Sequence, residues 1–285
     1  MLDLSEDKSS GIQYFKWTVK DPARVFLLVH GMGAHSERWK FFAEHLLQKN
    51  ISSYSLELRG FGQTADYKGH VDSLDAYYKD IARLAEIIKA ENPGKKIILA
   101  GESMGGLICF EFFLKHPEAA AALVCFSPAF ANNMKLDYPG VILPLFYNQK
   151  KQNTMPFTSA MCTSDRGYQK IMDADPREHR LATSSLLLQI LFAQMRSTLF
   201  AGKIEKPVLF LLAGDDKDLI VDPKASKTIF KRMKGNNKKL IQYPDMLHAL
   251  SIDIGRDNVF ADILDWVNAL IPLPFSQREK GDRQP

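Results

Sequence analysis

A serine, an aspartate and a histidine each follow a strand-like segment of this chain, and together these residue types can carry out acyl transfer. Ser103 lies at the centre of Gly101-Glu-Ser-Met-Gly105, directly after the apolar run 96–100. In a nucleophile elbow a strand turns abruptly into a helix, so the residues two before and two after the serine must be small. The segment 107–115 has helical character and ends at His116-Pro117. Ser103 is therefore predicted to be a nucleophile.

A serine hydroxyl needs a general base at neutral pH, usually a histidine that is held by a carboxylate. The apolar run 207–213 opens into the acidic loop 214–222, and the later strand-like run 239–243 is followed by His248. Each candidate lies just past a predicted strand, where an open parallel sheet places its sites. We therefore predict that His248 is the base and that a carboxylate of the acidic loop is its partner.

Four aspartates of this loop compete for the role of the acid: Asp215, Asp216, Asp218 and Asp222. Asp222 precedes Pro223 at the start of a predicted helix, and helix capping explains it. The string Asp218-Leu-Ile-Val221 resembles the step that follows the catalytic acid in the α/β-hydrolase superfamily. The order Ser, Asp, His along the chain is also that of the α/β hydrolases. Asp218 is the predicted acid, and Asp216 is the alternative.

A second glycine-rich motif, His30-Gly-Met-Gly33, follows the apolar segment 26–29. It resembles the oxyanion-hole loop of lipases and esterases. Negative charge develops on the carbonyl oxygen during acyl transfer, and each backbone N–H aimed at it contributes roughly 3 kcal/mol. By position, the two donors are expected to be the backbone N–H groups of Met32 and Met104. His30 and His35 are predicted to brace this loop rather than to transfer protons.

Four further strings carry a resemblance to one family: His30-Gly-Met-Gly-Ala-His-Ser-Glu-Arg-Trp39, Glu57-Leu-Arg-Gly-Phe-Gly62, Cys162-Thr-Ser-Asp165 and Asp173-Ala-Asp-Pro176. Together with the elbow, these strings make the chain resemble the monoacylglycerol lipase and lysophospholipase branch of the α/β hydrolases. This branch is also called the hydrolase-4 group of serine hydrolases. The resemblance extends from about Gly11 to Pro272. Glu57 and Phe61 replace the usual Asp and His of that family. Those positions are structural in the family, so the resemblance implies intact catalysis and a helical cap over the serine.

Strand-like and helical segments alternate along the chain, which predicts a mostly parallel central sheet with helices on both faces. Strands are expected at 11–17, 25–30, 52–57, 96–100, 121–127, 208–213 and 239–243, and helices at 38–49, 73–91, 107–116, 223–234 and 257–270. The predicted fold class is α/β, with an α/β-hydrolase core and an inserted cap. Residues 1–131 and 203–272 are assigned to the core, 132–202 to the cap, and the polar segment 273–285 to a tail that frays.

The segment 132–202 is too long for a structureless loop in a compact domain, which favours a small domain of its own. Its apolar residues exceed the number needed to anchor it, and the surplus predicts an apolar channel for an acyl chain. The expected channel residues are Phe146, Phe157, Leu187, Leu188 and Leu191. The surplus also favours a face that contacts membrane or lipid aggregates. The alternative is that these residues only pack the cap onto the core.

The composition of the 285 residues, 46% hydrophobic and 25% charged, suits one globular enzyme with a large core. No apolar run approaches the ~20 residues that span a bilayer, and the acidic N-terminus does not resemble a signal peptide. Cys109, Cys125 and Cys162 show neither metal-ligand spacing nor an even-numbered disulfide set, so we expect them to be free thiols. Free thiols indicate a reducing compartment, and we expect the protein to be cytoplasmic, with at most a peripheral position at the membrane. The net charge of +4 is dispersed and gives nucleic-acid binding little support.

The predicted reaction is the hydrolysis of an acyl ester through an acyl-enzyme. Ser103 attacks the carbonyl carbon, His248 takes the proton and Asp218 holds the imidazole in the required tautomer. No metal or organic cofactor is expected, and the substrate is a small-molecule ester of a medium or long acyl chain. A broad carboxylesterase or thioesterase, and more distantly a perhydrolase, are alternatives, because only the pocket distinguishes them. A non-catalytic binding protein of the same fold is disfavoured by the intact motifs.

Overall fold

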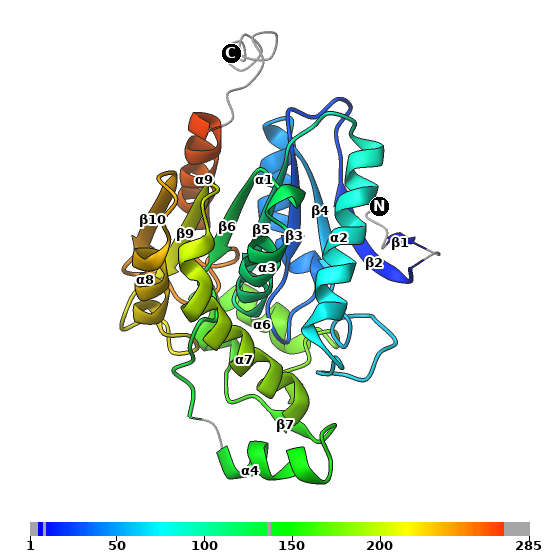
Figure 1. Ribbon diagram of the computed structural model, residues 1–285, viewed down its shortest axis with the longest axis vertical. Helices are drawn as coiled ribbons and strands as arrows, with labels where there is room; N and C mark the ends of the chain where they lie inside the picture. The colour runs from blue at the N-terminus through cyan, green and yellow to red at the C-terminus, as the bar shows by residue number, and fades with distance from the viewer. Residues whose placement is uncertain (1–4, 8–9, 136–137, 271–285) are drawn as a thin grey trace.

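An eight-stranded sheet forms the centre of the computed structural model, which describes residues 5–7, 10–135 and 138–270 (Figure 1). Its strand order is β1-β2-β4-β3-β5-β6-β9-β10. The strands are β1 (Ser5–Asp7), β2 (Ile12–Trp17), β3 (Val25–Val29), β4 (Ser52–Glu57), β5 (Ile97–Glu102), β6 (Ala122–Phe126), β9 (Val208–Ala213) and β10 (Lys238–Tyr243). Neighbours from β4 to β10 are parallel, and β2 is antiparallel to both of its neighbours. The predicted fold class is confirmed.

Strands β3, β6 and β9 are apolar at every position, as expected where helices cover both faces of a sheet. In β3, Val25, Leu27 and Val29 contribute to the core on one face, whereas Phe26 and Leu28 contribute to the core on the other. The first face is covered by α2 (Leu74–Glu91), α3 (Met104–Lys115) and α8 (Pro223–Arg232), and the second by α1 (Lys40–Gln48) and α9 (Arg256–Leu270). This arrangement fixes where the carboxyl ends of the parallel strands meet.

The segment 132–202, called the cap from here on, connects the neighbouring strands β6 and β9. It contains α4 (Tyr138–Ile142), α5 (Ser159–Cys162), α6 (Arg166–Ala174), α7 (Ser184–Phe200) and a two-stranded antiparallel sheet of β7 (Gln152–Thr154) and β8 (Leu181–Thr183). Figure 1 shows α4 at the end of the molecule opposite α9. Glu111 of α3 accepts hydrogen bonds from Arg196 Nε at 2.8 Å and Ser197 Oγ at 2.7 Å, which fastens α7 to the core.

Three short strands escaped prediction from the sequence. β1 and β7 consist of three polar residues each, and β8 is only Leu-Ala-Thr, so none of the three is long enough to show an apolar period. The three cysteines are buried free thiols, as predicted. Within the described ranges, none of the helices has the length and apolar character needed to cross a membrane. The predicted tail, 273–285, lies outside the described residues.

Candidate active site

Ser103 occupies the turn between β5 and α3 in a strained backbone conformation. Its φ of 57° and ψ of −121° lie in a region that non-glycine residues rarely adopt. The Ser103 N–H donates a hydrogen bond of 2.9 Å to the carbonyl of Phe126. A Cβ atom at Gly105 would lie 2.3 Å from the carbonyl oxygen of Val29, and one at Gly101 would lie 2.4 Å from that of Gly105. The turn therefore requires both glycines, as a nucleophile elbow does.

His248 and Asp218 form a buried hydrogen-bonded pair. His248 Nδ1 lies 2.9 Å from Asp218 Oδ2. Asp218 Oδ1 accepts hydrogen bonds from the backbone N–H groups of Ile220 at 3.1 Å and Val221 at 2.9 Å. Because an ionised carboxylate only accepts, the His248 Nδ1–H donates to it, and Nε2 is left unprotonated in the neutral imidazole. This is the tautomer that a general base requires.

The other three aspartates of the acidic loop have different surroundings. Asp215 and Asp216 are exposed, and Asp215 pairs with Lys227 Nζ at 2.7 Å. Asp222 is the N-cap of α8, where its Oδ1 accepts a hydrogen bond of 2.9 Å from the backbone N–H of Lys224, as predicted. Of the four candidates, Asp218 is the one that is hydrogen-bonded to His248.

Charges around His248 set its affinity for protons. Burial disfavours the imidazolium form, but the charge and hydrogen bond of Asp218 outweigh burial and raise the pKa of His248 above its ordinary value. Glu102 acts in the same direction as Asp218, and Arg38 opposes them. Burial raises the pKa of Glu102 itself, although hydrogen bonds from Ser251 counteract part of this effect. His248 is therefore a stronger base than an exposed histidine.

An apolar cavity opens onto Ser103 and His248. Four of the predicted channel residues lie in its wall: Phe157, Leu187, Leu188 and Leu191. Other lining residues are Met134, Leu145, Met155, Ile190, Gln194, Ile220, Val221 and Ala249. The wall formed by α7 follows helical spacing at 187, 190, 191 and 194, a signal that the sequence carries.

The expectation that Phe146 lines the channel is wrong. Its side chain is 85% exposed, and Leu145, Val141 and Ile142 line the cavity instead. The segment Leu143–Phe146 is a single 3₁₀ turn. Successive residues of such a turn point about 120° apart. Since Leu145 faces the cavity, its neighbour Phe146 faces solvent.

The loop after β3 lies against the elbow. A Cβ atom at Gly31 would lie 3.0 Å from Ser103 Cβ and 3.6 Å from Ser103 Oγ, so only glycine fits there without displacing the serine. Met32 and Met104 border the same cavity. His30 Nδ1 lies 2.8 Å from the Gly31 carbonyl oxygen, which agrees with the predicted bracing role.

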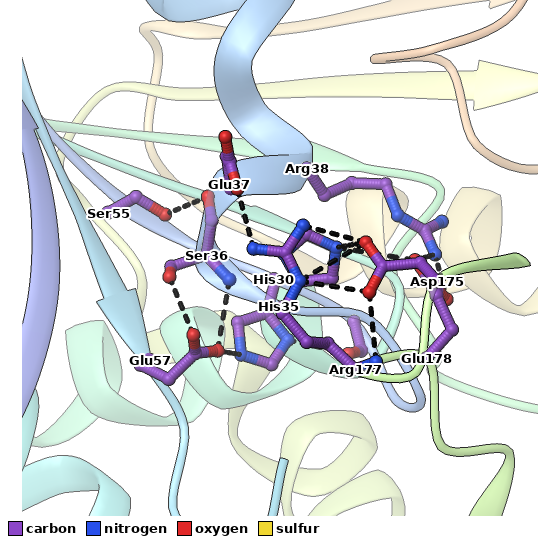
Figure 2. A network of polar contacts seen from close by, with 11 residues as sticks. His30, His35, Ser36, Glu37, Arg38, Ser55, Glu57, Asp175, Arg177 and Glu178 are labelled. Atoms are coloured by element: carbon purple, nitrogen blue, oxygen red, sulfur yellow. Dashed lines mark hydrogen bonds and ion pairs between the residues drawn. The ribbon is translucent and has the colours of Figure 1, made fainter. Parts of the chain in front are cut away.

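A buried polar network supports this loop from both sides (Figure 2). On the core side, Glu57 Oε1 accepts a hydrogen bond of 3.0 Å from the Ser36 N–H, and Oε2 accepts one of 2.9 Å from Ser36 Oγ. His30 Nε2 lies 3.3 Å from Glu57 Oε1. The glutamate that replaces the aspartate of the resembled family therefore has a structural role.

On the cap side, two ion pairs and a contact of the neutral His35 imidazole join residues 175–178 to residues 35–38 (Figure 2). Arg38 Nη2 pairs with Glu178, and Arg177 Nη1 lies 2.6 Å from Glu37 Oε2. His35 Nε2 lies 3.3 Å from Asp175 Oδ2. Burial, with Arg177 and Arg38 nearby, lowers the pKa of His35 to about 3, so His35 is neutral at physiological pH. The network anchors the cap beside the cavity.

Together, the sheet order, the serine elbow after β5 and the carboxylate–histidine pair after β9 and β10 define an α/β hydrolase. Residues 20–255 match the model of the Hydrolase_4 family, described as serine aminopeptidase, S33. The chain belongs to this family. In the described ranges, histidine, cysteine and carboxylate side chains form no group of three or more that could hold a metal ion.

Relatives of this chain include lipases. It is 24% identical over 261 residues to a monoacylglycerol lipase of Mycolicibacterium smegmatis, covering 90% of this chain and 92% of that protein. It is 25% identical over 262 residues to the human monoglyceride lipase, covering 90% and 86%. It also matches an abhydrolase domain-containing protein of Dictyostelium discoideum at 24% identity, covering 94% of this chain but only 29% of that longer protein.

Solved structures share the fold. The monoacylglycerol lipase of Paleococcus ferrophilus superimposes with a TM-score of 0.81 at 23% identity, covering 91% of this chain and 99% of that one. A soluble variant of the Saccharomyces cerevisiae monoglyceride lipase, solved with a substrate analog, gives a TM-score of 0.83 at 20% identity and covers 95% of each chain.

Proposed function

We propose that this protein is a serine ester hydrolase of the monoacylglycerol lipase or lysophospholipase type. One observation carries the proposal: Ser103 of the elbow and His248, which is paired with the buried Asp218, line the same apolar cavity. Relatives named as monoacylglycerol and monoglyceride lipases support the substrate class, a glycerol ester or another simple ester of a medium or long acyl chain.

The proposed mechanism proceeds through an acyl-enzyme. Ser103 Oγ attacks the ester carbonyl carbon while His248 Nε2 takes its proton, and Asp218 stabilises the imidazolium that forms. His248 then returns the proton to the leaving alcohol. A water molecule enters, loses a proton to His248 and attacks the acyl-enzyme carbonyl. The acid is released, and Ser103 recovers its proton.

The backbone N–H groups of Met32 and Met104 are the proposed oxyanion donors. Met104 is the first residue of α3, so its N–H belongs to the helix end that lacks intrahelical acceptors and carries the positive end of the dipole. Gly31 brings the Met32 loop against Ser103. Both donors face charge that develops only as the tetrahedral intermediate forms, which stabilises the transition state over the bound ester.

The acyl chain is proposed to lie along Phe157, Leu187, Leu188 and Leu191, which line the apolar cavity. Carboxylesterase, thioesterase and perhydrolase activities use the same triad chemistry. The apolar wall of the cavity favours a medium or long acyl chain over a short one.

Exposed apolar side chains of the cap support a peripheral contact with membrane or lipid aggregates. Those that are more than half exposed include Leu143, Phe146, Tyr147, Ile171, Met195 and Leu199. Leu143, Phe146 and Tyr147 lie within five consecutive residues, and an exposed apolar cluster is typical of an interaction face. The buried free thiols support a reducing, cytoplasmic location.

An activity profile tests the proposal. The assay compares kcat/KM of the wild type and Ser103→Ala for monoacylglycerols, p-nitrophenyl esters and acyl-CoA thioesters. Labelling by a fluorophosphonate probe reports whether the serine nucleophile is reactive. We expect labelling of the wild type alone and the highest kcat/KM on monoacylglycerols. A folded wild type that the probe does not label would support a non-catalytic binding protein instead, and a higher kcat/KM on thioesters would favour a thioesterase.

A further inference from the structure

Glu102 links the elbow to the loop that carries His248. It is the last residue of β5, directly precedes Ser103 and is 5% exposed in the cavity wall. Ser251 donates to both carboxylate oxygens of Glu102: the Ser251 N–H donates to Oε1 at 3.0 Å, and Ser251 Oγ donates to Oε2 at 2.8 Å. Because Ser251 lies three residues after His248, this contact ties the histidine loop to the nucleophile turn.

The burial of this carboxylate is not offset by an ion pair. Among the described residues, Glu102 has no ion pair, whereas Glu111, a buried glutamate of α3, pairs with Arg196 Nε at 2.8 Å. A buried charge without a paired cation destabilises the folded state. The N–H and hydroxyl of Ser251 require only hydrogen-bond acceptors, and the neutral side-chain amide of a glutamine at position 102 would supply one of them. A carboxyl group at this buried position therefore calls for an explanation other than folding.

Three charged groups from different elements act electrostatically on the imidazole of His248, and two of them, Glu102 and Arg38, line the same cavity as His248. Asp218 comes from the loop after β9, Glu102 from the end of β5, and Arg38 from the turn Ser36–Trp39 before α1. Arg38 is itself paired with Glu178 of the cap. Two carboxylates therefore stabilise the positive charge that His248 gains during the reaction, and Asp218 is the one that also makes a hydrogen bond to the ring.

We propose that Glu102 is a positioning residue for the reaction: it holds the loop of His248 in register with Ser103 and, as a second carboxylate, stabilises the imidazolium formed in the transition state. The proposal rests on the proposed function of Ser103 and His248. Its two parts separate experimentally, because Ser251→Ala removes a hydrogen bond and keeps the charge, whereas Glu102→Gln removes the charge and keeps an acceptor.

The test measures kcat and KM for p-nitrophenyl butyrate as a function of pH in the wild type, Glu102→Gln, Ser251→Ala and the control Glu111→Gln. Rates are expressed per fluorophosphonate-labelled site, so loss of folded protein does not enter. For Glu102→Gln we expect kcat to fall about tenfold at unchanged KM. The acid limb of kcat/KM should move to lower pH by about 0.5 to 1 unit, since His248 loses a favourable charge. Ser251→Ala should lower kcat a few-fold without moving the limb downward, and Glu111→Gln should change neither per labelled site.

The proposal is overturned if Glu102→Gln keeps the wild-type kcat per labelled site and the wild-type acid limb. If Glu102→Gln does not fold, Ser251→Ala decides the positioning role: a lower kcat per site supports it, and an unchanged kcat refutes it. A wild type that is folded but neither labelled nor active contradicts the proposed function itself, a result distinct from all of these.

Discussion

Replacing Asp218 by asparagine should abolish turnover by forcing His248 into the wrong tautomer. Asp218 Oδ1 accepts two backbone hydrogen bonds, from Ile220 and Val221. In Asp218→Asn the amide oxygen has to keep these bonds, so the NH₂ group faces His248 Nδ1, which lies 2.9 Å from the carboxylate in the wild type. An NH₂ group only donates, so Nδ1 must lose its proton and Nε2 must carry one.

A histidine protonated at Nε2 cannot take the proton of Ser103. We expect kcat to fall about 10⁴-fold, the loss known for this change in a serine triad, which corresponds to about 5.4 kcal/mol of transition-state stabilisation. The assay compares p-nitrophenyl butyrate hydrolysis by Asp218→Asn and by the matched variant Asp216→Asn, whose side chain is exposed. Circular dichroism and thermal unfolding establish that both are folded. Loss of turnover in Asp216→Asn with retention in Asp218→Asn would refute this reasoning.

Three further predictions follow from the site. Turnover requires neutral His248, whose pKa is raised. We therefore expect kcat/KM to fall as the pH drops through an apparent pKa above the ordinary ~6.5, and an apparent pKa below ~6.5 would contradict this. Leu188→Asp should reduce the hydrolysis of p-nitrophenyl decanoate far more than that of p-nitrophenyl butyrate, because each buried methylene of the acyl chain contributes up to about 0.8 kcal/mol. The control Phe146→Asp, at an exposed side chain, should leave the ratio of the two activities unchanged in detergent-free solution. Equal losses on both esters in Leu188→Asp would indicate that Leu188 only packs the cap onto the core. Gly105→Ala should lower the melting temperature and probe labelling together, since its Cβ would lie 2.3 Å from the Val29 carbonyl; a wild-type melting temperature would show that the elbow relaxes easily.

Local patterns sufficed to predict the core of the fold and the positions of the reactive groups along it. The continuous apolar runs of the parallel strands and the glycines of the elbow are short-range signals, and the strand ends determine where Ser103 and His248 lie. The choice of Asp218 over its neighbours agrees with its hydrogen bond to His248. β1 was missed because it is a polar edge strand of three residues.

Features that depend on tertiary contacts could not be predicted. Phe146 is apolar like its neighbours, and only the direction of one 3₁₀ turn decides that it faces solvent. The contact between Glu102 and Ser251 joins residues 149 positions apart, and that between Arg38 and Glu178 joins residues 140 apart. Neither shows a local pattern, because a charged residue in a sequence has the same appearance whether it is solvated or buried beside a distant partner.

The ion pairs between residues 35–38 and 175–178 mean that the cap and the core cannot be exchanged independently. A cap transplanted from a relative that lacks Glu178 would leave Arg38 buried without its counter-charge, and breaking a buried pair from one side typically costs about 3–5 kcal/mol. Chimaeras made to alter substrate preference should therefore carry both halves of the network, or replace both by apolar residues. The same reasoning suggests that the two segments accumulate substitutions together over evolution, a covariation that aligned sequences of the family would reveal.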